Sequence, residues 1–233
     1  MQYINPYIEL CLEGSDSVFK GLSQKEKEII ANHHTISIFK KGEYIFKEGD
    51  KVRGLICLAS GKAKTYKNGV GGREQILQMV NQSECLGYRG LFSENTWSFS
   101  AIALGDSTVC LLAKHSLVKI LKKNSELSFK VNKVLADELW YSYNRTISLT
   151  QKHVRGRLAE SMLLLAEIYG YEEDGKTLRA ALSRDDIAHL SNMTTSNAIR
   201  TLSNFASESI IELKGRRIKI INLPGLEDIN ESA

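Results

Sequence analysis

The feature that most restricts the fold of this chain is a change of hydrophobic period near residue 117. Between Thr35 and Ala113 the apolar residues fall into short runs separated by Gly-containing turns, whereas no Gly or Pro interrupts Asn124 to Leu149. The short runs predict β-strands, and the uninterrupted stretch predicts a single helix of about 25 residues. We therefore expect an α+β protein in which a β-domain precedes a long helix.

The expected strands lie close together in the first half of the chain. The run Asn68-Gly69-Val70-Gly71-Gly72 is a strong hairpin signal between two of them. Many short strands with Gly-rich turns indicate a β-sandwich or barrel. The expected strands are Thr35–Phe39, Tyr44–Phe46, Leu55–Ala59, Ala63–Tyr66, Gln75–Val80, Ser98–Leu104 and Val109–Ala113.

The long helix is expected to be covered on two sides, because apolar residues lie on two of its faces. One cover would be the β-domain. Near-heptad spacing suits packing against the same helix of a second subunit as the other cover. A core helix within one monomer is the alternative. One face carries Leu127, Val131, Leu135, Leu139, Ser142, Thr146 and Leu149; the other carries Phe129, Ala136, Trp140, Tyr143 and Ile147.

Three helices and a hairpin are expected after residue 151. An amphipathic helix begins near Lys152 and ends at Gly170, a short helix follows Ser183, and another helix begins near Thr194. Ser183 resembles the start of a capping box, with an acidic residue three positions later. Two short helices with a brief break, followed by a basic hairpin, are typical of a winged helix-turn-helix. The expected hairpin strands are Ile210–Leu213 and Ile218–Ile221.

The last of these helices has a face of small polar groups, and a cationic turn follows it. Arg can bond two acceptors on guanine, Asn can pair with adenine, and hydroxyls, Lys and Arg bind phosphates. The ordered set therefore predicts binding to double-stranded DNA. The polar face carries Thr194, Thr195, Ser196, Asn197, Arg200 and Ser203, and the hairpin carries Lys214, Arg216, Arg217 and Lys219.

Charge sets a condition on this interpretation. The formal net charge is +4, divided into +5 on residues 1–150 and −1 on residues 151–233. A DNA-binding C-terminal part therefore cannot rely on bulk charge and needs a local basic face. The acidic residues lie mainly at Glu172–Asp174 and after Leu226, apart from the hairpin in sequence.

Other functional classes find little support in the sequence. There is no P-loop, no dinucleotide fingerprint, no Ser/His/Asp arrangement and no His-x-His pair followed by Glu. We therefore expect no catalytic residues and no enzymatic activity; a ligand-binding or interaction protein that does not bind DNA is the alternative. Without an apolar stretch of about 18 residues or a signal peptide, a cytoplasmic protein that does not contact membranes is expected.

The four cysteines, Cys11, Cys57, Cys85 and Cys110, lie far apart in sequence and form no C-x-x-C pair. We expect four separate apolar thiols in a reducing compartment and no metal site. The alternative is a cluster or haem ligand that folding assembles from distant cysteines.

Three stretches of the chain match one protein family. Phe39–Asp50 looks like the opening of a cyclic-nucleotide-binding β-roll, His153–Ala159 like the first helix of a DNA-binding domain, and Glu212–Ile220 like its wing. Together they make the chain, from about residue 19 to 225, resemble the Crp/Fnr family of bacterial transcription regulators.

The resemblance implies a three-part homodimer. A sensor β-roll (double-stranded β-helix) would occupy residues 1–123, a dimerisation helix and hinge residues 124–151, and a winged helix-turn-helix residues 152–233. A palindromic DNA operator and RNA polymerase are the implied partners, with an effector bound in the β-roll.

The resemblance also implies the DNA contacts. Ser196 stands where the family commonly has a Glu that accepts a bond from cytosine, so we expect a different operator sequence. Base contacts fall on Thr195, Ser196 and Arg200, and phosphate contacts on Ser183, Thr194 and Asn197, with Arg184, Lys214 and the wing residue Arg216 nearby.

The sensor end departs from the cyclic-nucleotide binders of the family. Tyr88 replaces the Glu that binds the ribose, and Phe99 replaces the Arg that binds the phosphate, next to Ser100. Strand alternation would point the neighbouring Arg89 to the opposite face, so we expect an effector other than cAMP. On the long helix, Ser142 and Tyr143 fall at the positions that meet the effector in relatives.

The cofactor is left open. Haem is one possibility, with His33, His34 and His115 as candidate ligands, for gas or redox sensing. An iron–sulfur cluster is not expected, because the family's cysteine cluster near the N-terminus is reduced here to Cys11. An unidentified small molecule, or a dimer that is active without an effector, completes the alternatives.

Overall fold

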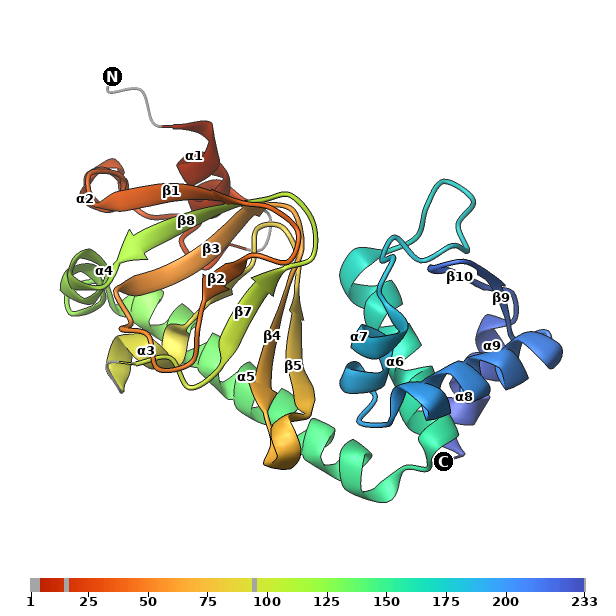
Figure 1. The fold of residues 1–233 in the computed structure, drawn as a ribbon. Helices are drawn as coiled ribbons and strands as arrows, with labels where there is room; N and C mark the ends of the chain where they lie inside the picture. Colours follow the sequence, from red (N-terminus) through yellow and green to blue (C-terminus); the bar gives the residue numbers. More distant parts are fainter. Residues whose placement is uncertain (1–4, 15–16, 94–95, 233) are drawn as a thin grey trace. The chain divides into compact units, whose positions relative to one another are not determined.

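The computed structural model describes residues 5–14, 17–93 and 96–232, and the chain divides into two compact units. The first unit comprises Met1–Lys67 and Gln78–Trp140, and the second comprises Asn68–Leu77 and Tyr141–Ala233. Figure 1 shows the order of the elements along the chain. The ends of the expected three-part division, residues 1–4 and 233, lie outside the described residues.

The strands of the first half form two four-stranded sheets (Figure 1). All seven expected strands are confirmed to within a few residues, and one short strand, β6, was not predicted. One sheet has the order β1 (His34–Phe39), β8 (Ser107–Ala113), β3 (Gly54–Ser60), β6 (Cys85–Leu86). The other has the order β2 (Tyr44–Phe46), β7 (Ser100–Ala103), β4 (Ala63–Asn68), β5 (Glu74–Val80), with the short 3-10 helix η1 (Val70–Gly72) between β4 and β5.

Alternation along these strands produces two separate cores. On β3, Ile56 and Leu58 join a cluster with residues of the opposite sheet, such as Phe46 and Ala101. Cys57 points the other way, into a cluster with helical residues. A strand that is apolar on both faces must be covered on both sides, and the continuous apolar run of β3 reflects this.

Helices cover the outer face of the first sheet. They are α1 (Pro6–Glu13), α2 (Gln24–Ala31), α3 (Tyr88–Phe92), α4 (Lys114–Leu121) and the first part of α5 (Ser125–Gln151). Ile8, Ile30, Leu91, Leu117 and Leu127 bring all five helices into one buried cluster with this sheet. The long helix α5 was predicted, whereas α1 and α2 were not.

The second unit contains the expected helices and hairpin. They are α6 (Val154–Tyr169), α7 (Arg184–Leu190), α8 (Thr195–Ser207), the strands β9 (Ile211–Lys214) and β10 (Arg217–Ile220), and a further helix α9 (Leu223–Glu231) that was not predicted. Leu158, Met162, Leu202 and Phe205 form the buried interior. The α+β fold with a β-roll, a long helix and a winged helix-turn-helix is thus confirmed.

Candidate functional site

The helix-turn-helix is defined by two side-chain caps. The hydroxyl of Ser183 accepts a bond from the Asp186 backbone amide (3.0 Å), and the Asp186 carboxylate completes a capping box at the start of α7. The hydroxyl of Thr194 accepts from the Asn197 amide (3.2 Å) at the start of α8. Caps fix where each helix begins. They therefore also determine which residues of α8 face outward.

The outward face of α8 is polar with one apolar residue. Ser196, Arg200, Ser203 and Asn204 are exposed, while Ala198, Leu202 and Phe205 are buried. Ile199 is 48% exposed within this face. The sequence analysis did not single out Ile199, although an isoleucine on a polar helix face is a signal for apolar contact, for example with a thymine methyl group.

Three of the expected contact residues on α8 take part in bonds within the protein. The Thr195 hydroxyl donates to the Asp185 carboxylate (2.6 Å), and Arg200 donates through Nη2 to Asn197 Oδ1 (2.8 Å). The Asn197 amide oxygen thus orients the guanidinium of Arg200. Ser196 and Arg200 are exposed, while Thr195 and Asn197 are only partly so.

The wing is a two-residue turn between β9 and β10 that carries exposed cations. Gly215 has φ +60°, a conformation that L side chains rarely adopt, and allows the turn. Lys214, Arg216 and Arg217 are exposed. Lys219 lies on the same hairpin, with its ammonium 3.4 Å from Asp174. Backbone and side-chain bonds from Thr177, together with smaller contributions including that of Lys219, hold the pKa of Asp174 well below its usual range.

Arg184 connects α7 to the wing. Its Nη2 donates to the Gly215 carbonyl at 2.7 Å. Its Nη1 is buried and has no hydrogen-bond partner among the residues that the structure describes. Burial lowers the pKa of Arg184. The residue therefore positions the wing turn.

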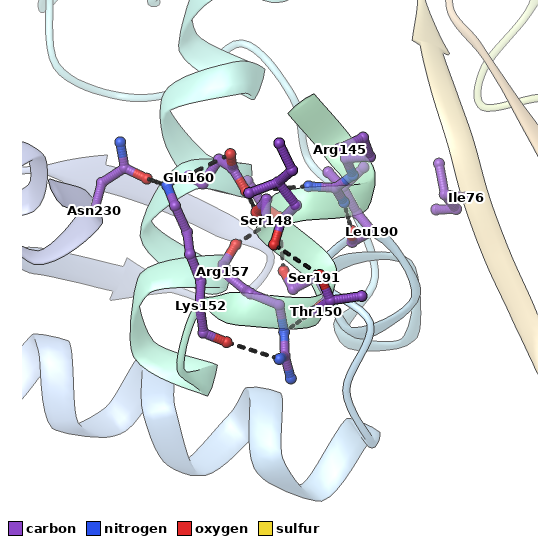
Figure 2. Close-up of polar contacts among 12 residues, drawn as sticks. Ile76, Arg145, Ser148, Thr150, Lys152, Arg157, Glu160, Leu190, Ser191 and Asn230 are labelled. Carbon is purple, nitrogen blue, oxygen red and sulfur yellow. Dashed lines mark hydrogen bonds and ion pairs between the residues drawn. The ribbon is translucent and has the colours of Figure 1, made fainter. Parts of the chain in front are cut away.

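A polar network ties the end of α5 to the helices of the second unit (Figure 2). Arg145 Nη1 lies 3.3 Å from Glu160 Oε2 and its Nη2 donates to the Leu190 carbonyl. Ser148 also donates to Glu160. Lys152 Nζ lies 3.5 Å from Glu160 Oε1. The carboxylate of Glu160 is thus shared by three residues of the segment that leads into α6.

The same network reaches the turn between α7 and α8. Arg157 donates through Nε to the Ser191 carbonyl and through Nη1 to the Lys152 carbonyl, both at 3.0 Å. Lys152 Nζ donates to Asn230 Oδ1 of α9 at 2.6 Å (Figure 2). Sequence reasoning missed this network, because its members are separated by up to 78 positions.

The hairpin tip at residues 68–77 contacts the same turn. Gln75 donates to the His189 carbonyl (2.9 Å), and Arg73 donates to Asn192 Oδ1 (3.2 Å). Asn192 has a positive φ of 49°, a conformation that Asn adopts more readily than most residues. The turn before α8 is therefore fixed from two sides within the second unit.

The expected effector residues do not form one group in the roll. Tyr88 is buried in the helix-covered cluster, whereas Phe99 packs against the inter-sheet cluster. Burial raises the pKa of the Tyr88 hydroxyl. The Ser100 hydroxyl accepts from the Glu48 amide at 3.0 Å. Tyr88 and Phe99 thus contribute to different hydrophobic clusters, and their contact with an effector stays a prediction.

One argument about Arg89 was wrong. Tyr88–Phe92 is the helix α3 and not a strand, so strand alternation does not fix the direction of this side chain. Arg89 Nη2 donates to Ser98 Oγ at 2.6 Å. Ser98 directly precedes Phe99 in the sequence. On α5, Ser142 and Tyr143 are both exposed.

The prediction of four separate thiols was also wrong. Cys57 and Cys85 form a disulfide between β3 and β6. Cys11 and Cys110 are free and buried, and their side chains are hydrogen-bonded to each other. The pairing could not be read from the sequence, because the disulfide alone spans 28 positions.

The candidate haem ligands lie outside the cores. The rings of His33 and His115 are 4.8 Å apart in an edge-to-face arrangement. His33 and His34 each bond a backbone carbonyl, of Ile29 and Ala31 respectively. Among the described residues, no three His, Cys, Asp or Glu side chains gather as metal ligands would, and no helix has the length and apolar character needed to span a membrane.

Comparison with known proteins matches both parts of the chain. A cyclic nucleotide-binding domain model matches residues 37–124, and a Crp-like helix-turn-helix domain model matches residues 156–229. Electron transport regulator A of Shewanella oneidensis is 29% identical over 184 residues, which cover 78% of this chain and 73% of that protein.

Two further relatives extend the match. The CRP-like cAMP-activated global transcriptional regulator of Mycobacterium tuberculosis is 28% identical over 205 residues, covering 87% of this chain and 91% of that protein. The structure of FixK2 from Bradyrhizobium japonicum shares the fold, with a TM-score of 0.77 at 23% identity over 86% of this chain and 98% of that one. These relatives are regulators and not enzymes. The chain belongs to the Crp/Fnr family of DNA-binding transcription regulators.

Proposed function

We propose that this chain works as a homodimer that reads a palindromic operator with helix α8, under the control of an effector other than cAMP in the β-roll. The exposed polar face of α8 beside a cationic wing carries the proposal. Both lie on a scaffold whose helix starts are capped and whose turn is fixed by hydrogen bonds.

Base reading is assigned to the exposed face of α8. Arg200, oriented by Asn197, would donate to the acceptors on guanine, and Ser196 would bond a neighbouring base. Thr195 would have to share its hydroxyl with Asp185. Ile199 adds an apolar contact for a thymine methyl group.

Phosphate binding is assigned to helix starts and to the wing. Ser183 and Thr194 are the N-caps of α7 and α8, and Thr194 is exposed. Lys214 and Arg216 extend from the wing, and Arg184 holds the wing turn through Gly215. These contacts fix the protein on the duplex without selecting a sequence.

Homodimerisation is supported by the uncovered face of α5. Phe129 is 73% exposed, Trp140 66%, Tyr143 56% and Ile147 53%. These residues follow a near-heptad spacing, and such a stripe on a two-stranded coiled coil packs against its own copy. We therefore propose that residues 124–151 supply the contact between the two subunits.

The interior of the roll argues against cAMP as effector. Phe46 stacks on Trp97 with ring centres 3.9 Å apart, and Phe99 lies 5.7 Å from Phe46. Arg89 is exposed, and its guanidinium already donates to Ser98 Oγ. A cyclic phosphate needs a charged bidentate donor, and Phe99 presents an aromatic ring instead.

Haem-based sensing is the second candidate, supported by the close pair His33 and His115. A Soret band in protein purified without oxygen from haem-supplemented cells would establish it, and a featureless spectrum would remove it.

We place the protein in the cytoplasm, with RNA polymerase as a further partner, because regulators of this family act on DNA.

Salt dependence of DNA binding tests the proposed function. Affinity for a random-sequence duplex should fall steeply as salt rises, because the wing and helix starts displace counterions from phosphates. A shallow slope, or no binding at low salt, would favour an interaction protein that does not bind DNA.

A further inference from the structure

The four cysteines form a row on the helix-covered face of the sheet β1-β8-β3-β6. Cys57 of β3 stands opposite Cys85 of β6 on one side and opposite Cys110 of β8 on the other. Directly opposed residues on antiparallel strands have Cβ atoms about 4.5–5.5 Å apart on one face. Cys110 in turn is hydrogen-bonded to Cys11 of α1. The row therefore runs Cys85, Cys57, Cys110, Cys11.

The two ends of the row differ in exposure. Cys11, Cys57 and Cys110 are each 0% exposed, whereas Cys85 is only partly buried. Solvent therefore reaches the row at Cys85. Within the inner pair, the hydrogen bond from Cys11 lowers the pKa of Cys110 and raises that of Cys11. Cys110 stands directly opposite Cys57, so it is the inner thiol placed to attack the outer disulfide, and the thiolate is the attacking form.

We propose that this row is a thiol–disulfide exchange site at which a small-molecule disulfide, such as oxidised glutathione, oxidises Cys85 and the oxidation passes inward to Cys11 and Cys110. Disulfides of proteins in a reducing compartment are usually transient and redox-sensing. The Cys57–Cys85 bond is the first intermediate of this path.

The exchange steps balance without a further reactant. The Cys85 thiolate attacks the small disulfide and releases one glutathione thiolate; Cys57 then attacks the mixed disulfide, forms Cys57–Cys85 and releases the second. Cys110 attacks Cys57 and frees Cys85, and Cys11 attacks Cys110 and frees Cys57. Each attacking thiol gives up a proton and each released thiolate takes one. A second small disulfide restores the outer pair.

The inner disulfide would act on the dimer helix. It would bind α1 covalently to β8 within the cluster that also contains Leu127 and Val131 of α5. The site thus supplies the effector input of the proposed function, on which this part of the inference rests. Such an input needs no ligand pocket.

Disulfide mapping of the wild-type protein is the first test. Fully reduced protein is mixed with oxidised glutathione, and samples are alkylated over time and digested for mass spectrometry. We expect Cys57–Cys85 to form first and Cys11–Cys110 to follow. If the Cys11–Cys110 disulfide forms first, or if only glutathione adducts form, the proposal is overturned by the wild-type protein alone.

A pair of variants tests the direction of transfer. In Cys85→Ser, oxidation of Cys11 and Cys110 should slow about tenfold or more, because the exposed acceptor is gone. In the matched control Cys11→Ser, Cys57–Cys85 should form at the wild-type rate. Equal rates of inner-pair oxidation in Cys85→Ser and wild type would contradict the relay.

DNA binding of the two states tests the regulatory part. Reduced and doubly oxidised protein should differ at least about fivefold in Kd for the same operator duplex. Equal Kd values would overturn the link to α5. Absence of DNA binding in both states would instead overturn the proposed function, while disulfide mapping still decides on the exchange site.

Discussion

The winged helix-turn-helix and the β-roll place their chemically active groups in opposite ways. Ser196, Arg200 and Arg216 stand on the surface of the second unit, above a core that contains Phe205. In the roll, the cysteines and the stacked aromatic rings lie within the two cores. A surface that reads DNA needs rigid support and free side chains, whereas groups in a core act by changing how the core packs.

The difference indicates how each unit should respond to substitution. Changes on the surface of α8 should alter binding and leave stability nearly unchanged. Changes in the roll should alter stability or redox chemistry first, and DNA binding only through α5. The following predictions test this division.

The largest effect is expected from Phe205→Ala. Phe205 is 0% exposed, and the guanidinium of Arg155 lies 4.8 Å from its ring centre. The cavity should lower the free energy of unfolding of the second unit by about 3–5 kcal/mol and abolish DNA binding. Denaturant unfolding followed by circular dichroism measures this.

Phe92→Ala is the matched control, because Phe92 is 58% exposed on α3. It should change stability by less than about 0.5 kcal/mol. Similar losses in the two variants would contradict the assignment of Phe205 to a separate core.

Arg200→Ala should weaken operator binding by about 1–3 kcal/mol and relax base preference at one position of each half-site. The reason is the loss of the bidentate contact that Asn197 orients. Fluorescence anisotropy with single-base variants of the operator measures both effects, and unfolding should be unchanged.

Arg216→Ala provides the contrast for Arg200. Removal of an exposed wing cation that binds phosphate should weaken DNA binding equally for all sequences. It should also reduce the slope of log affinity against log salt concentration by about one. Uniform weakening in Arg200→Ala, without relaxed preference, would show that Arg200 binds phosphate and not a base.

Thr194→Ala should destabilise the second unit by about 0.5–2 kcal/mol, because the first amides of α8 lose their cap. Ser203→Ala removes a hydroxyl from the middle of the same helix, where it only bonds the Ile199 carbonyl. If both variants unfold at the same denaturant concentration, the cap does not define the start of α8.

The smallest effect concerns a partly buried carboxyl in the roll unit. Burial raises the pKa of Glu138 on α5, so the folded state holds this proton more tightly than the unfolded state. Stability contributed by the protonated form is present at low pH and is lost as the pH rises through the folded-state pKa. Glu138→Gln should therefore raise Tm at pH 7–8, with the gain shrinking toward pH 4.

Thermal unfolding across this pH range checks the Glu138 prediction. Glu126→Gln is the matched control, since Glu126 lies on the same helix with its side chain 77% exposed. A gain for Glu138→Gln that is equal at all pH values would show that charge burial is not its cause.

The helices and hairpin that carry the proposed DNA-contact surface were predictable because their signals are local. The caps at Ser183 and Thr194 and the wing turn at Gly215 each depend on residues within a few positions of one another. Helix α9 was missed although Asn222 caps it and a proline follows in its first turn. The α2 capping box at Ser23 was a signal of the same kind.

The row of four cysteines was not predictable, because it depends on pairing between distant strands. The position of Cys57 opposite both Cys85 and Cys110 follows from strand register, which the sequence does not show. Tyr88 and Phe99 join different clusters, because Tyr88–Phe92 forms a helix that turns Tyr88 toward the helix-covered core.

Selection from a random duplex library tests the central claim most directly. Wild-type protein is bound to the library, and retained DNA is sequenced over several rounds. We predict a palindrome whose half-sites are centred about 10–10.5 base pairs apart or a multiple of that, as two α8 helices of a dimer require. Enrichment of no sequence, or of a single asymmetric site, would contradict a homodimer that reads DNA with α8.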